Sequence, residues 1–68
     1  MPVLEYHLAE GSFTAAQGER LLVESSRFYA EVLKSPIERV RVFIHAHKPH
    51  AVAVGGIPVA RGAPPAPY

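Results

Sequence analysis

The chain opens with Pro2-Val-Leu-Glu-Tyr-His-Leu8, the stretch from which the rest of the fold can be worked out. Its side chains alternate in character, which is typical of a strand with two different faces. Glu10-Gly11 then indicates a turn. One strand face is apolar or aromatic and carries Leu4, Tyr6 and Leu8. The other face is mixed and carries Val3, Glu5 and His7.

The next segment has the spacing of an amphipathic helix over about residues 15–34. Thr14 and Gln17 match a capping box at its start. Gly18 should weaken the first turns by about 1 kcal/mol relative to Ala. We expect the apolar stripe of this helix, with Phe28 and Tyr29 included, to form the core; its members are Leu21, Leu22, Ser25, Phe28, Tyr29, Val32 and Leu33.

A second alternating run, residues 39–47, predicts another strand. Ser35-Pro-Ile-Glu38 before it fits one short helical turn. A strand–helix–strand order makes the two strands parallel in almost all known proteins. One face of the second strand is apolar and carries Val40, Val42, Ile44 and Ala46. The other face is mixed and carries Arg39, Arg41, Phe43, His45 and His47.

The predicted fold class is α/β (α+β): a β-α-β subunit with parallel strands, one long helix and a C-terminal β-hairpin. Residues 51–54 and 57–60, separated by Gly55-Gly56, predict the hairpin. We expect residues 1–68 to form a single domain, of which about 61–68 are a Pro-rich tail. Because one helix covers only one sheet face, we infer that the other face packs against further copies.

The composition narrows the classes of function. A chain of 68 residues buries little surface alone, and small domains usually need disulfides, metals or partner subunits for stability. The lack of cysteine excludes disulfides and thiolate metal sites. We therefore expect self-association to stabilise the fold. The net charge is +1 and the basic residues are scattered, which gives no sign of nucleic-acid binding. We find no apolar stretch that would span a membrane and no signal peptide, and we expect a cytoplasmic protein.

The nitrogen of Pro2 is a candidate general base. If Met1 is removed, this nitrogen is a free secondary amine at the start of the first strand. An α-amino group has a reference pKa of roughly 7.7–8.0, and burial or a nearby cation lowers it. A neutral amine can take up and return a proton. If Met1 is retained, the nitrogen is an amide, and Pro2 merely begins a strand.

The histidines suggest a metal site only weakly. His45 and His47 share one face of the second strand, with His50 shortly after, and histidine is the commonest metal ligand. The chain has no Cys or Asp, and no Glu lies close to these histidines in sequence. Partly exposed strand-end histidines explain the pattern better, with a substrate contact as an alternative. His7 fits a structural or interface role. We therefore expect no metal and no cofactor.

Four short motifs occur in a specific order and spacing. They are Pro2 after Met1, His-Leu-Ala-Glu-Gly at 7–11, Ser35-Pro-Ile-Glu-Arg-Val-Arg-Val42 and Val52-Ala-Val-Gly-Gly56. Together they resemble the 4-oxalocrotonate tautomerase family, the small members of the tautomerase superfamily. The resemblance covers roughly residues 2–57, with one extra residue after Gly11.

This resemblance implies a subunit that assembles as a hexamer or a trimer of dimers. It implies a cofactor-free isomerase that interconverts enol and keto forms of small 2-oxo or 2-hydroxydienoate carboxylates from aromatic breakdown. Pro2 would be the base. Arg41, which the family often lends from a neighbouring subunit, would bind the 2-oxo acid end, with Arg39 as a second candidate; alone, Arg41 also fits a solvated residue or an ion pair between subunits. An apolar wall would keep the amine neutral, formed by Leu8, Val52 and Val54.

Two departures from the family bear on the substrate. Ser12 and Phe13 stand where the family has an arginine that grips the far carboxylate of a diacid, and Val52 replaces an aromatic residue. Ser12 remains a candidate for substrate binding. We expect the substrate to be a monocarboxylate or a more apolar ketone. A dehalogenase or decarboxylase of small acids that uses the same proline is an alternative. Another is a non-catalytic partner subunit of a hetero-oligomer, which lends Arg41 to a second chain.

Overall fold

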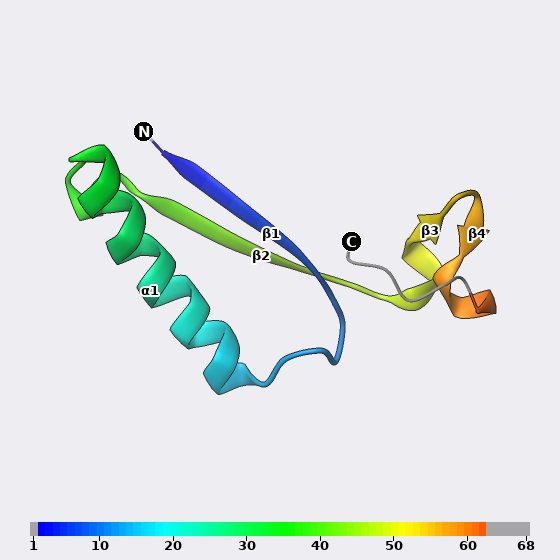
Figure 1. The fold of residues 1–68 in the computed structure, drawn as a ribbon. Coiled ribbons are helices and arrows are strands. Elements are labelled where there is room, and N and C mark those ends of the chain that lie inside the picture. Colours follow the sequence, from blue (N-terminus) through cyan, green and yellow to red (C-terminus); the bar gives the residue numbers. More distant parts are fainter. Residues whose placement is uncertain (1, 63–68) are drawn as a thin grey trace.

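The computed structural model describes residues 2–62 and contains the expected β-α-β unit (Figure 1). Strand β1 is Val3–Ala9, helix α1 is Ala15–Leu33 and strand β2 is Arg41–His47. The two strands are parallel, with Val3 opposite Arg41 and Ala9 opposite His47. Together with the hairpin described below, this confirms the predicted fold class. Of the expected Pro-rich tail, residues 63–68 lie outside the described residues.

A small antiparallel hairpin follows the β-α-β unit. It consists of β3 (Ala53–Val54) and β4 (Ile57–Pro58). Gly55 and Gly56 join the strands with φ of 60° and 82°. Two-residue hairpin turns of this kind need positive φ at both positions, which glycine adopts without strain. The strands are shorter than predicted, because 3-10 turns replace their outer residues. Figure 1 shows the hairpin beyond the end of β2, far from the C-terminal end of α1.

The start of α1 follows the prediction from sequence. The Thr14 hydroxyl accepts a hydrogen bond from the Gln17 amide (3.1 Å), and the Gln17 side-chain oxygen accepts one from the Thr14 amide (2.9 Å). These bonds satisfy two donors that a helix end leaves unpaired. Gly18 also has a packing role, since a Cβ placed on it would lie 3.2 Å from the Phe13 ring. The absence of a side chain therefore lets Phe13 lie over the first turn.

The helix covers the sheet face that carries Leu4, Tyr6 and Leu8, but the core is small. Val40 is the only buried hydrophobic residue among residues 2–62. Tyr29 is half-buried, whereas Phe28 is 61% exposed, so our assignment of Phe28 to the core is wrong for a single copy. Two strands make a sheet too narrow to cover the whole apolar stripe of the helix. Val32 and Leu33, from the same stripe, are exposed as well.

The second strand begins later than its sequence pattern predicts. Residues Ile37–Arg39 form a 3-10 turn, and the Val40 amide donates to the Ile37 carbonyl at 3.1 Å. Pairing with β1 starts only at Arg41, because the amides of Arg39 and Val40 are already bonded within the turn, to the Pro36 and Ile37 carbonyls. Arg39 therefore lies on the turn and does not share a strand face with Arg41, contrary to our prediction.

Candidate functional site

Pro2 and Arg41 lie side by side where the two parallel strands begin. The Arg41 amide donates a hydrogen bond of 3.1 Å to the Pro2 carbonyl, and the next residue, Val3, is paired with Arg41 in the sheet. Pro2 is half-buried and Arg41 is exposed. Parallel pairing brings the starts of both strands to one sheet edge, so this contact follows directly from the β-α-β topology.

The Arg41 guanidinium is anchored on one side. Its Nη1 donates to the Glu38 carbonyl at 2.6 Å and to the Val40 carbonyl at 3.2 Å. Within residues 2–62, its Nε and Nη2 have no hydrogen-bond partner. Those two atoms form the fork that a carboxylate binds with two parallel hydrogen bonds. The guanidinium is therefore held through one terminal nitrogen, while its other two nitrogens can donate to an acid.

The other predicted site residues lie away from this pair within one copy. Leu8 is about 20 Å along β1 from Pro2, on the face covered by α1. Ser12 sits in the turn after β1, where its hydroxyl donates to the Ala9 carbonyl at 2.6 Å. Val52 and Val54 belong to the hairpin region at the far end of the molecule (Figure 1). A single copy thus brings Pro2 and Arg41 together and leaves the rest apart.

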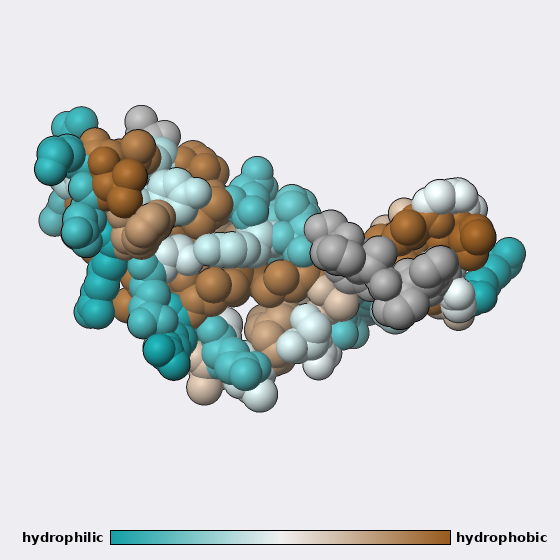
Figure 2. Space-filling model, viewed as in Figure 1, coloured by the Kyte–Doolittle hydropathy of each residue, from teal (hydrophilic) through white to brown (hydrophobic). Residues whose placement is uncertain are grey.

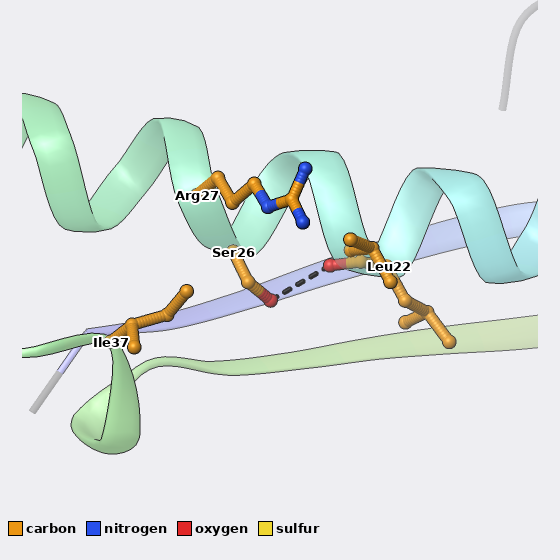
Figure 3. A pocket seen from close by; sticks show the side chains of 5 residues that line it. Leu22, Ser26, Arg27 and Ile37 are labelled. Carbon is orange, nitrogen blue, oxygen red and sulfur yellow. Dashed lines mark hydrogen bonds between the residues drawn. The ribbon is translucent and has the colours of Figure 1, made fainter.

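An open hollow of about 410 Å³ lies elsewhere, between α1 and the 3-10 turn that precedes β2 (Figure 3). None of the predicted site residues lines it. The Ser26 hydroxyl at its wall donates to the Leu22 carbonyl of the same helix, at 2.7 Å, and is therefore already satisfied. The lining is mostly apolar and consists of Leu22, Val23, Ser26, Arg27 and Ile37.

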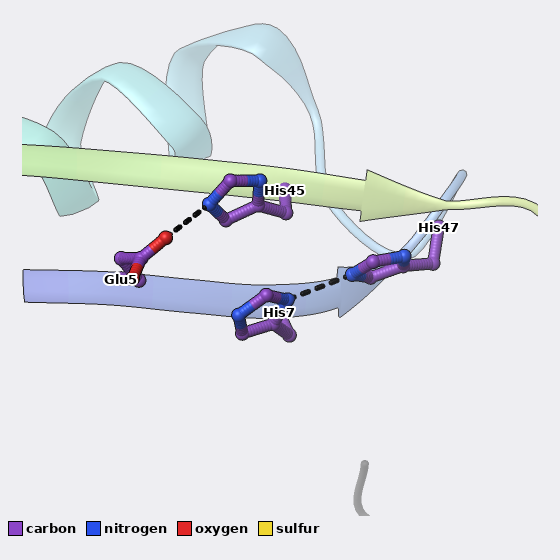
Figure 4. A network of polar contacts seen from close by, with 4 residues as sticks. All are labelled: Glu5, His7, His45 and His47. Carbon is purple, nitrogen blue, oxygen red and sulfur yellow. Dashed lines mark hydrogen bonds and ion pairs between the residues drawn. The ribbon is translucent and has the colours of Figure 1, made fainter.

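The uncovered sheet face carries a polar cluster that the sequence analysis missed (Figure 4). Glu5 and His7 of β1 lie beside His45 and His47 of β2. His45 Nε2 is 2.7 Å from Glu5 Oε1, and His7 Nδ1 is 2.8 Å from His47 Nε2. No glutamate lies close to His45 in sequence, but strand pairing brings Glu5, which is 40 residues away, beside it. The expected parallel pairing was the signal that would have found it.

Hydrophobic side chains are exposed over several parts of the molecule. Figure 2 shows apolar surface both at the C-terminal end of α1 and over the hairpin. On the uncovered sheet face, Val3 and Phe43 are 55% and 48% exposed. Other large exposed side chains are Val23, Phe28, Val32, Leu33, Ile37 and Ile57. In the described part of the chain, no helix has the length and apolar character needed to cross a membrane.

Solved structures of 4-oxalocrotonate tautomerases resemble this chain over most of its length. A heterohexamer 4-oxalocrotonate tautomerase from Chloroflexus aurantiacus J-10-fl is 28% identical, with a TM-score of 0.78, and the match covers 93% of this chain and 100% of that one. An isozyme from Methylibium petroleiphilum is 27% identical, with a TM-score of 0.75 and coverage of 88% and 95%. An unfused 4-oxalocrotonate tautomerase is 28% identical, with a TM-score of 0.74 and coverage of 88% and 97%.

These structures confirm the resemblance that the four sequence motifs indicated. They support a place for the chain in the tautomerase superfamily and are consistent with an isomerase. No protein-family model matches the sequence, and the comparison with curated proteins gave no match.

Proposed function

We propose that this chain is a cofactor-free tautomerase of small 2-oxo or 2-hydroxydienoate carboxylates, with Pro2 as the general base. The observation that carries the proposal is the contact between Pro2 and Arg41 at the start of the parallel strands. This backbone contact puts both residues where the two strands begin. With Met1 removed, the Pro2 amine and the Arg41 side chain would share that end of the sheet. The resemblance to 4-oxalocrotonate tautomerases supports the same assignment.

The chemistry requires a neutral amine and a bound acid. With Met1 removed, the Pro2 nitrogen accepts the proton of the enol and returns it to a distal carbon, which yields the conjugated ketone. The free Nε and Nη2 of Arg41 bind the carboxylate and favour the negative charge that develops on the neighbouring oxygen. Arg39, on the adjacent turn, is a second cation for the same acid.

We further propose that the complete site is built from several copies. Pro2 and Arg41 lie where the two strands begin, whereas Ser12, Val52 and Val54 follow their ends, so a neighbouring copy would be needed to bring both groups together. Extensive apolar exposure and a core with one buried hydrophobic residue in the described chain support self-association. The neighbour from Chloroflexus aurantiacus is itself a heterohexamer.

The test is the turnover of phenylenolpyruvate or a 2-hydroxydienoate by the purified protein and by Pro2→Ala. General acid–base catalysis contributes about 10²–10⁴-fold to rates, so we expect a loss of that size in the variant. Pro49→Ala, which changes an exposed proline outside the proposed site, is the matched control and should retain full turnover. The intact mass should show that Met1 has been removed. Unchanged turnover in Pro2→Ala, or a working protein that retains Met1, would rule out the mechanism.

A second candidate is a partner subunit that lends Arg41 to another chain. The heterohexameric neighbour favours it, because tautomerases of this fold do assemble from two kinds of chain. Native mass spectrometry separates the two candidates. An active assembly of this polypeptide alone supports the first, whereas a protein that assembles and turns over substrate only with a second polypeptide supports the other.

A further inference from the structure

We propose that Glu5, His7 and His45 form a binding site for a divalent transition-metal ion on the uncovered face of the β1–β2 sheet. Each residue offers one ligand atom, and these atoms all lie within 4.8 Å of one another. All three come from a single chain and are aligned by strand pairing, with His7 directly opposite His45. The backbone that carries the ligands is therefore held by the sheet.

The ligand atoms are close enough for one tetrahedral ion, but the stacked rings of His7 and His45, 9° from parallel, must rotate so that their nitrogens converge on it. Zinc–nitrogen and zinc–oxygen bonds of about 2.0–2.2 Å place neighbouring tetrahedral ligands about 3.3 Å apart. Glu5 Oε1 and His45 Nε2 are at 2.7 Å and would separate slightly, while the wider pairs would close. In one copy, the side chains of His45 and Glu5 are 41% and 52% exposed, which leaves room on the solvent side for these rotations.

His47 orients one of the ligands. Its Nε2 lies 2.8 Å from His7 Nδ1, and the two rings are stacked at 5.1 Å between centroids. When His7 carries its proton on Nδ1, it donates this bond and leaves the Nε2 lone pair for a metal. Figure 4 shows His7 Nε2 on the side away from His47. A hydrogen bond to the second nitrogen is the usual way in which proteins fix a metal-binding histidine.

The donor set indicates which ions the site would take. Two imidazoles and one carboxylate suit Zn²⁺, Co²⁺, Ni²⁺ or Cu²⁺, whereas Mg²⁺ and Ca²⁺ prefer oxygen ligands alone. Three protein ligands also leave a fourth position for water or a small anion. The His7–His45 pair lies about 13 Å along the strands from the Val3–Arg41 pair, so the site does not depend on the proposed tautomerase.

The test is titration of the full-length protein with Zn²⁺ by calorimetry and with Co²⁺ by absorption spectroscopy. We expect one ion per chain and the intense visible bands of tetrahedral Co²⁺. His47→Phe keeps a ring in place but removes its nitrogens, and should weaken binding about 10–100-fold. Glu5→Gln and His45→Ala remove ligands and should weaken it further. Pro2→Ala should bind as the wild type does.

His50→Ala is the matched control, because His50 is exposed on the turn after β2 and lies outside the cluster. It should leave the affinity unchanged. Far-ultraviolet circular dichroism checks that each variant is folded, and the nearly isosteric Glu5→Gln keeps the test valid if His45→Ala does not fold. The proposal is overturned if the wild type binds neither ion, or if Glu5→Gln binds as tightly as His50→Ala. In either case the cluster would be only a stack of polar side chains.

Discussion

The Ser25 hydroxyl is buried between α1 and the sheet, where it hydrogen-bonds to the Tyr6 hydroxyl at 2.6 Å. This bond ties the middle of the helix to the middle of β1. A buried polar group that loses its partner costs about 1–3 kcal/mol, and a satisfied hydrogen bond contributes about 1 kcal/mol. The pair therefore explains how a serine is tolerated within the apolar stripe of the helix.

Removal of this bond should destabilise the protein measurably. We expect Ser25→Ala and Tyr6→Phe each to lower the free energy of unfolding by about 1 kcal/mol, and the double variant to lose less than the sum. Urea unfolding at one fixed protein concentration measures this, since assembly makes stability depend on concentration. Ser26→Ala is the control, because its hydroxyl bonds only within the helix. Strictly additive losses from Ser25 and Tyr6 would show that the two hydroxyls act independently.

Single residues also show where sequence reasoning stops. The alternation of β1 correctly put Glu5 and His7 on the face away from the helix. The contact of Glu5 with His45, however, joins residues 40 apart in sequence and depends on the register of the two strands. Arg39 shows a different difficulty. Its alternation with Arg41 continued the strand pattern, but Arg39 lies in a 3-10 turn, where its amide donates to the Pro36 carbonyl.

At the scale of elements, the helix start is the feature that its local sequence determines most directly. Thr14 and Gln17 exchange two hydrogen bonds across the first turn, and both were predicted from their spacing alone. Such capping is local, because every atom involved lies within four residues. The hairpin was predicted for a similar reason, since the turn conformation of Gly55-Gly56 belongs to glycine itself.

Loss of the cap should destabilise the helix without any change at the sheet. We expect Thr14→Ala to lower the free energy of unfolding by about 1 kcal/mol, because the backbone N–H of Gln17 loses its acceptor. Thr14→Ser keeps an acceptor oxygen and should stay close to the wild type. Thermal unfolding followed by circular dichroism compares the two. If both variants were equally destabilised, the stabilisation would come from the threonine methyl group and not from the cap.

At the scale of the whole molecule, the surface is the part that the sequence predicted least well. The pattern correctly indicated one apolar helix stripe and one mixed sheet face. It could not show how much of the stripe a two-stranded sheet leaves uncovered, and Phe28 was assigned to the core for that reason. Isolated two-stranded sheets are marginal in water, and burial of one large apolar side chain contributes about 1.5–3 kcal/mol. We therefore expect contacts between copies to supply much of the free energy that stabilises the fold.

Phe43 offers the most direct test of that expectation. It lies on the uncovered sheet face between Arg41 and His45, and it is 48% exposed in one copy. If this face packs against other copies, Phe43→Glu would bury an unpaired charge at the contact and shift the assembly toward monomers. Size-exclusion chromatography with light scattering at micromolar concentration measures the change. Ala16→Glu, which adds the same charge on the exposed first turn of α1, should keep the wild-type mass. A monomeric wild type, or a Phe43→Glu variant of unchanged mass, would mean that this face does not hold the copies together.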